Sequence, residues 1–128
     1  MTFSRKRSAS RFSISVGAAL SLLAAAPAFA HAALRHATPA AGETVDTPAT
    51  KLTLEFSCDI DLTAVELEVR DAGGRDIEFV APSGEARQGP TIERFAEAPL
   101  APGLYGVKWR VLSTDGHHTR GSYTFEVK

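Results

Sequence analysis

The stretch from Ala101 to Val111, with the sequence APGLYGVKWRV, carries the clearest evidence for the fold of this chain. Its apolar side chains from Tyr105 to Val111 alternate with glycine, lysine and arginine, which predicts a strand with one buried and one wet face. A turn precedes this strand, and Tyr105 follows Gly103 by two residues. That arrangement resembles the tyrosine corner of Greek-key sandwiches, so we expect a tyrosine that anchors a turn at the start of a strand.

The same alternation recurs on both sides of this stretch. Strands are predicted at 52–56, 65–70, 91–95 and 123–127, and the doublet Gly73-Gly74 predicts a hairpin that leads into a strand at 76–80. A loop rich in proline, serine and glycine runs from Pro82 to Pro90. No stretch keeps a helical period. The sequence therefore predicts an all-β protein, an immunoglobulin-like Greek-key β-sandwich of about seven strands.

The first 30 residues have the pattern of a secretory signal peptide. Basic residues from Arg5 to Arg11 precede an apolar stretch from Phe12 to Leu23, and Ala28-Phe29-Ala30 is a small-residue cleavage motif. The apolar stretch is shorter than the about 20 residues that span a bilayer. We expect cleavage after Ala30, export of the protein, and one mature domain of residues 31–128.

Charge and cysteine content narrow the class of partner. All fifteen acidic residues lie after residue 30, together with only ten of the fourteen basic ones. This acidic balance argues against a nucleic-acid partner. The lone Cys58 cannot form a disulfide within the chain, so we expect the fold to depend on its core alone.

The residues with metal-binding chemistry gather between the last two predicted strands, in the segment STDGHH from Ser113 to His118. In an extended segment, residues two apart point the same way, so Asp115 and His117 are expected to converge while His118 faces elsewhere. Alone, this pattern equally fits an aspartate that caps a turn beside solvated histidines.

The position of His31 favours a metal site. Cleavage after Ala30 would free the amine of His31, so this residue would offer a metal both an amine and an imidazole. With Asp115 and His117 it supplies three nitrogens and one oxygen, a set typical of tetragonal Cu(II).

Together, several segments resemble the CopC family of periplasmic copper-binding proteins, and the resemblance covers essentially all of residues 31–128. The family implies a Greek-key β-sandwich that binds Cu(II) through His31, Asp115 and His117. It also implies a role in copper resistance or uptake, often beside an inner-membrane partner of the CopD type. The segments that carry the resemblance are His31-Ala32, Thr38-Pro39-Ala40, Leu52 to Ser57, Pro102 to Tyr105 and Trp109 to His117.

Two departures from the family pattern bear on the site. Some members carry a methionine-rich loop for Cu(I), but the only methionine here is Met1, so we expect a site for Cu(II) alone. Some relatives carry a glutamate where this chain has Cys58. A thiol there could ligate or reduce copper, although we favour a small buried thiol at the end of a strand. His36 and His118 are the alternative ligands.

Three classes of function remain open at this point. The favoured one is a carrier or buffer that binds and hands over Cu(II) without turnover, which is not an enzyme. The second is a copper-dependent oxidase with an N-terminal histidine site. The small size, the lack of an exposed aromatic platform and the charge of Asp115 argue against it. The third is a metal-free immunoglobulin-like interaction module.

Overall fold

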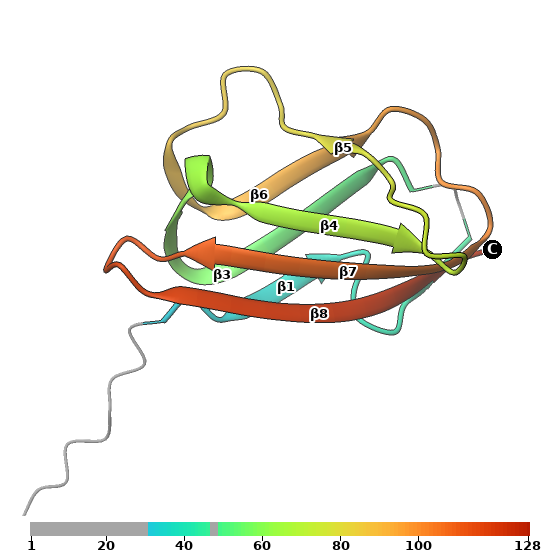
Figure 1. Ribbon diagram of the computed structural model, residues 1–128, viewed down its shortest axis with the longest axis horizontal. Helices are drawn as coiled ribbons and strands as arrows, with labels where there is room; N and C mark the ends of the chain where they lie inside the picture. The colour runs from blue at the N-terminus through green and yellow to red at the C-terminus, as the bar shows by residue number, and fades with distance from the viewer. Residues whose placement is uncertain (1–30, 47–48) are drawn as a thin grey trace, which may run out of the picture.

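The computed structural model describes residues 31–46 and 49–128, which form two facing β-sheets (Figure 1). The described residues contain eight strands and one short 3-10 helix. One sheet has the strand order β1-β3-β6-β5 and the other the order β2-β8-β7-β4. The predicted signal peptide and its cleavage motif lie outside the described residues. The elements are β1 (Leu34–Thr38), β2 (Thr44–Val45), β3 (Lys51–Asp61), η1 (Leu62–Ala64), β4 (Glu66–Asp71), β5 (Phe79–Val80), β6 (Gln88–Ala96), β7 (Gly103–Leu112) and β8 (His118–Val127).

The order of the strands confirms the prediction of an all-β sandwich. β5 pairs with β6 and β7 pairs with β8 as antiparallel neighbours, whereas the other connections cross from one sheet to the other. Crossing connections of this kind are characteristic of Greek-key sandwiches. Two of the strands, β2 and β5, are only two residues long, and so short a strand leaves no alternation in the sequence. No helix in the described ranges is long and apolar enough to cross a membrane.

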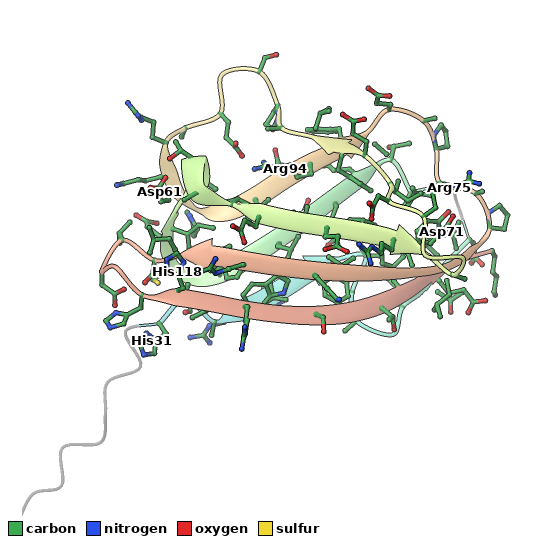
Figure 2. All side chains as sticks on the ribbon, viewed as in Figure 1. His31, Asp61, Asp71, Arg75, Arg94 and His118 are labelled. Atoms are coloured by element: carbon green, nitrogen blue, oxygen red, sulfur yellow. The ribbon has the colours of Figure 1, made fainter. Side chains whose placement is uncertain are left out.

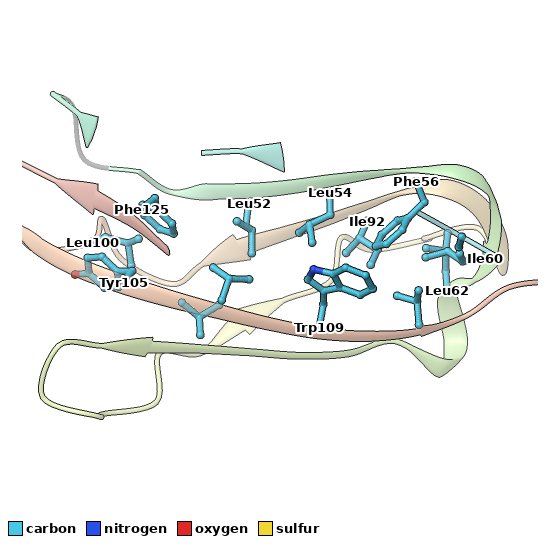
Figure 3. Packing of buried hydrophobic residues seen from close by; sticks show 14 of the residues in the cluster. Leu52, Leu54, Phe56, Ile60, Leu62, Ile92, Leu100, Tyr105, Trp109 and Phe125 are labelled. Atoms are coloured by element: carbon cyan, nitrogen blue, oxygen red, sulfur yellow. The ribbon is translucent and has the colours of Figure 1, made fainter. Parts of the chain in front are cut away.

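The core fills the space between the two sheets (Figure 3). Leu52, Leu54 and Phe56 point inward from β3, as the alternation predicts, and each is at most 3% exposed. The rings of Phe56 and Trp109, which come from opposite sheets, pack in a T-shaped arrangement with 5.1 Å between their centroids. Burial of such apolar surface is the main favourable contribution to folding, so these inward positions hold the sheets together.

The tyrosine corner expected from the sequence is present. Tyr105 is buried, and its hydroxyl donates a hydrogen bond of 2.6 Å to the carbonyl of Ala101, four residues upstream. Its ring stacks on Phe125 of β8, with 5.4 Å between centroids. The hydroxyl thus fixes the turn that enters β7 while the ring contributes to the core.

The hairpin predicted at Gly73-Gly74 is only partly correct. β4 turns back after Asp71, whose carboxylate accepts hydrogen bonds from the backbone of Gly73 and Arg75. Beyond a single bridge at Asp76, however, the chain leaves this sheet, and its strand is limited to β5, which pairs with β6 of the other sheet. The expected strand at 76–80 is therefore wrong in length and partner. The physical reason is that Phe79 packs on the core from the opposite sheet.

Candidate metal centre

The chain segment that carries His31 is fixed at two points before β1 begins. The amide of Ala33 donates a hydrogen bond of 3.0 Å to the hydroxyl of Ser57 in β3. The amide of Ser57 donates one of 2.8 Å to the carbonyl of Ala33. Ala32 is buried, and its carbonyl accepts a hydrogen bond of 2.8 Å from the hydroxyl of Thr119 in β8. His31 itself remains exposed. The segment therefore holds the His31 backbone at the same end of the sandwich as the β7–β8 loop, as Figure 2 shows.

The β7–β8 loop presents Asp115 and His117 through a tight turn. Ser113 is 2% exposed, and its hydroxyl contacts the carboxylate of Asp115 and the carbonyl of His117. The turn closes through hydrogen bonds from Ser113 N to His117 O and from Gly116 N to Ser113 O. Gly116 has a φ of 90°, a backbone conformation that glycine adopts without steric cost. The expectation of an extended segment is thus wrong, yet the two side chains converge because the turn brings them together.

His31, Asp115 and His117 form one cluster. Each offers one donor atom, and these atoms all lie within 4.8 Å of one another. The rings of His31 and His117 meet edge to face at 4.5 Å between centroids. Two donor atoms that share a metal ion at about 2.0–2.1 Å lie at most about 4.2 Å apart. Small side-chain rotations of exposed residues would close that difference, so the cluster fits a metal ion in size.

The carboxylate of Asp115 is held in its ionised form. The hydroxyl of Ser113 is the main cause that lowers the pKa of Asp115 below its usual 3.8; partial burial opposes this, and contacts with His117 add to it. The hydrogen bonds from Ser113 Oγ and His117 N both end on Oδ1. His117 Nδ1 lies 3.2 Å from the same oxygen. Within the described part of the chain, Oδ2 therefore remains the oxygen that can face a metal.

The alternative ligands named from the sequence lie outside this cluster. Cys58 is half-buried and packs against the core. The expectation that it ends a strand is wrong, because β3 continues to Asp61. His36 lies opposite Glu55 on the β1–β3 pair. His118 opens β8 opposite Leu112. In the described residues, the group with metal-ligand spacing contains only the three residues first chosen.

Sequence reasoning missed the residues that position this cluster. Ser113 continues the inward frame of β7 beyond Val111, and a polar residue in that frame was a readable signal. Ser57 and Thr119 left no signal, because their hydroxyls act on backbone groups that are distant in sequence.

The fold and the cluster together define a small two-sheet β-sandwich that presents imidazole and carboxylate groups at one end. Residues 34–128 match the sequence model of the CopC domain. The chain belongs to the CopC family. Asp115 and His117 lie within the matched residues, and His31 lies three positions before the match begins at residue 34.

Relatives and solved structures agree with this assignment. Protein YobA of Escherichia coli K12 is 37% identical over 101 residues, which cover 78% of this chain and 81% of the relative. Copper resistance protein C of Xanthomonas campestris pv. juglandis is 33% identical over 111 residues, covering 83% and 87%. The crystal structure of CopC from Methylosinus trichosporium OB3b superposes with a TM-score of 0.65 at 29% identity, over 77% of this chain and 94% of the other.

A second solved structure sharpens the contrast in methionine content. PcoC of Escherichia coli, described as a methionine-rich copper resistance protein, has a TM-score of 0.65 at 27% identity, over 77% of this chain and 99% of the other. This chain has a single methionine, Met1. The relatives with functional names are copper resistance proteins, in agreement with the prediction that the chain is not an enzyme.

Proposed function

We propose that this protein binds one Cu(II) ion through His31, Asp115 and His117 and serves as a periplasmic copper carrier or buffer. The observation that carries the proposal is the convergence of three donor groups from positions 31, 115 and 117 within 4.8 Å in a family of copper resistance proteins. Imidazole and carboxylate groups suit Cu(II), whereas the soft thioether and thiolate groups that select Cu(I) are not part of the cluster.

The exported form would begin at His31, and its amine would then complete the ligand set. Amine and imidazole of one residue form a chelate, so the ion would meet three nitrogens and one carboxylate oxygen. The exposure of all three residues leaves the ion open to a receiving protein. Such a site suits transfer without turnover, with an inner-membrane transporter of the CopD type as the proposed partner.

Electron paramagnetic resonance of the form beginning at His31, with one equivalent of Cu(II), tests the ligand set. We expect a single tetragonal Cu(II) signal with nitrogen hyperfine structure. Competition titrations should rank the affinity for Cu(II) above those for Zn(II) and Cu(I). Several overlapping signals, or a spectrum unchanged in His117→Ala, would contradict the proposal.

The cysteine provides a matched control for the metal's oxidation state. Cys58→Ser should leave the Cu(II) spectrum unchanged, because this half-buried thiol lies outside the cluster. Tight Cu(I) binding that survives this substitution would contradict a site for Cu(II) alone. Loss of Cu(I) binding in the same variant would instead identify the thiol as a ligand.

A further inference from the structure

We propose that Thr119 is a positioning residue that sets the distance of His31 from the Asp115–His117 pair, an inference that rests on the proposed function. The hydroxyl of Thr119 donates to the carbonyl of Ala32, 87 positions away in the sequence. Ala32 is covalently next to His31, and Thr119 is two residues after His117. One hydrogen bond thus joins the two halves of the cluster by their shortest path through the chain.

The two anchors of the N-terminal segment differ in what they connect. Ser57 lies in β3 and ties Ala33 to the sheet that also contains β1. Thr119 lies in β8, in the opposite sheet, whose β7–β8 loop carries Asp115 and His117. Ser57 also donates a hydrogen bond of 3.4 Å to the carbonyl of His31, and β3 reaches the β7–β8 loop through the hydrogen bond from Thr114 N to Asp59 O. That route needs two hydrogen bonds and the backbone of β3. Thr119 lies on the strand that follows His117 and joins the two halves of the cluster through one hydrogen bond.

Burial protects the hydrogen bond between Thr119 and Ala32 from water. Ala32 is 1% exposed, so water cannot readily replace the hydroxyl at its carbonyl. The His31 side chain is exposed and forms no hydrogen bond within the described residues, so its order depends on the backbone that precedes β1. A ligand held in place before the ion arrives loses less conformational entropy on binding, and this gain appears as affinity.

The test uses the form that begins at His31 and compares Thr119→Val, which keeps the shape and removes the hydroxyl, with Thr119→Ser, which restores a hydroxyl. We expect Thr119→Val to weaken Cu(II) binding about two- to tenfold, the range of one intramolecular hydrogen bond. Its Cu(II) resonance should broaden into more than one species. Thr119→Ser should recover most of the wild-type affinity and spectrum. Thr124→Val is the matched control, because Thr124 lies exposed on the same strand.

A double-mutant cycle separates positioning from a general loss of structure. If Thr119 acts through residue 31, Thr119→Val should change the Cu(II) affinity by less than about twofold in a protein that carries His31→Ala and one extra residue before position 31, because that background lacks both the imidazole and the amine. An equal loss in both backgrounds would overturn the proposal, as would wild-type affinity in Thr119→Val. In the metal-free protein, the Ala33 amide should exchange faster in Thr119→Val than in Thr124→Val.

The outcomes also separate this inference from the function on which it rests. If the wild-type protein fails to bind Cu(II), the proposed function fails and the tether fails with it. If the wild type binds Cu(II) while Thr119→Val matches it in affinity, spectrum and Ala33 exchange, only the tether fails.

Discussion

The two ends of the sandwich differ in which polar side chains they leave exposed. At the end where β7 begins, called the tyrosine end below, the hydroxyl of Tyr105 donates a hydrogen bond to the carbonyl of Ala101, and the ring of Tyr105 stacks on Phe125. At the other end, which carries the proposed metal site and is called the metal end below, the hydroxyls of buried Ser113 and half-buried Thr119 hold the backbone, while His31, Asp115 and His117 stay exposed. The comparison teaches that stability and binding are separable here, because the ligands contribute little to the core and the core supplies no ligand.

Removing two ligands at the metal end should give the largest effect. We expect Asp115→Ala with His117→Ala to weaken Cu(II) binding by more than about a hundredfold, because loss of an outer-shell partner alone typically costs 10–100-fold. Ser113 would still donate to the His117 carbonyl, so the metal-free melting temperature should stay near the wild-type value. Competition titration measures the loss of Cu(II) affinity, and calorimetry measures the melting temperature of the metal-free protein. A copper-induced rise in melting temperature equal to that of the wild type would move the site elsewhere.

Lengthening the chain by one residue before His31 tests the amine separately from the side chains. The amine becomes an amide nitrogen with no available lone pair at neutral pH, while the imidazole of His31 and the core stay intact. We expect Cu(II) affinity to fall about a hundredfold, the lower end of the about 10²–10⁴-fold gain that a tethered second interaction contributes. The resonance spectrum should show one nitrogen fewer. Identical affinities and spectra for both forms would exclude the amine as a ligand.

A substitution that disturbs the core should reduce stability and leave Cu(II) affinity unchanged, the reverse of the two changes above. A Cβ at Gly121 would lie 2.4 Å from Cζ2 of Trp109, a contact that the large indole can relieve only by moving. Gly121→Ala should therefore reduce the free energy of unfolding by about 1–3 kcal/mol, the usual cost of overpacking. Urea denaturation measures it. The Cu(II) affinity of the folded protein should not change.

Gly106→Ala is the matched control for this substitution. A Cβ at Gly106 would meet no atom within 4 Å, although the residue lies in the neighbouring strand β7. Equal destabilisation by the two substitutions would mean that general strand propensity, and not the indole contact, sets the effect.

The hydroxyls of the two tyrosines give a smaller and cleaner contrast. Tyr105→Phe removes the bond to Ala101 and should cost about 0.5–1.5 kcal/mol of stability, the net contribution of one hydrogen bond. Tyr123→Phe is the control. Its hydroxyl is buried without a hydrogen-bond partner among the described residues, and burial raises the pKa of Tyr123 to about 12. That change should leave stability equal or slightly higher. Thermal denaturation of both variants, with unchanged Cu(II) affinity, checks the contrast.

The same contrast between ends explains how much could be predicted from the sequence. The tyrosine end rests on local pattern, because Gly103, Tyr105 and the alternation to Val111 are close together in the chain. The fold class and the corner were therefore readable. The metal end rests on contacts between distant segments. Its proposed ligands were chosen from residue chemistry and converge in the structure, but the turn at Gly116 and the anchor of Ala32 depend on tertiary packing that no local pattern encodes.

Long strands with steady alternation were easier to predict than the connections between them. β7 and the first half of β3 follow the predicted inward frame. The segment after Gly73-Gly74 does not, because after the bridge at Asp76 the chain crosses to the opposite sheet, where Phe79 packs on the core. Arg94 also occupies an inward position of β6, where Glu85 pairs with it at 2.7 Å. Alternation predicts an apolar residue there, and only the folded loop supplies the partner.

The smallest expected effect concerns the acid stability that Asp115 contributes at the metal end. In the folded protein, the Ser113 hydroxyl holds the pKa of Asp115 below 3.8. A depressed carboxyl pKa contributes stability that is fully present above the pKa of the unfolded state and is lost as the pH falls through the pKa of the folded state.

Asp115→Asn keeps an acceptor for Ser113 but cannot ionise. In metal-free protein, the wild type should therefore be slightly more stable than Asp115→Asn at pH 6, and this advantage should vanish below pH 3.8. Asp61, whose pKa Thr63 also lowers, contributes equally to both proteins and cancels in the difference. Melting temperatures of the pair from pH 6 to pH 2 measure it, and a difference that grows on acidification would show that Ser113 does not favour the ionised carboxylate.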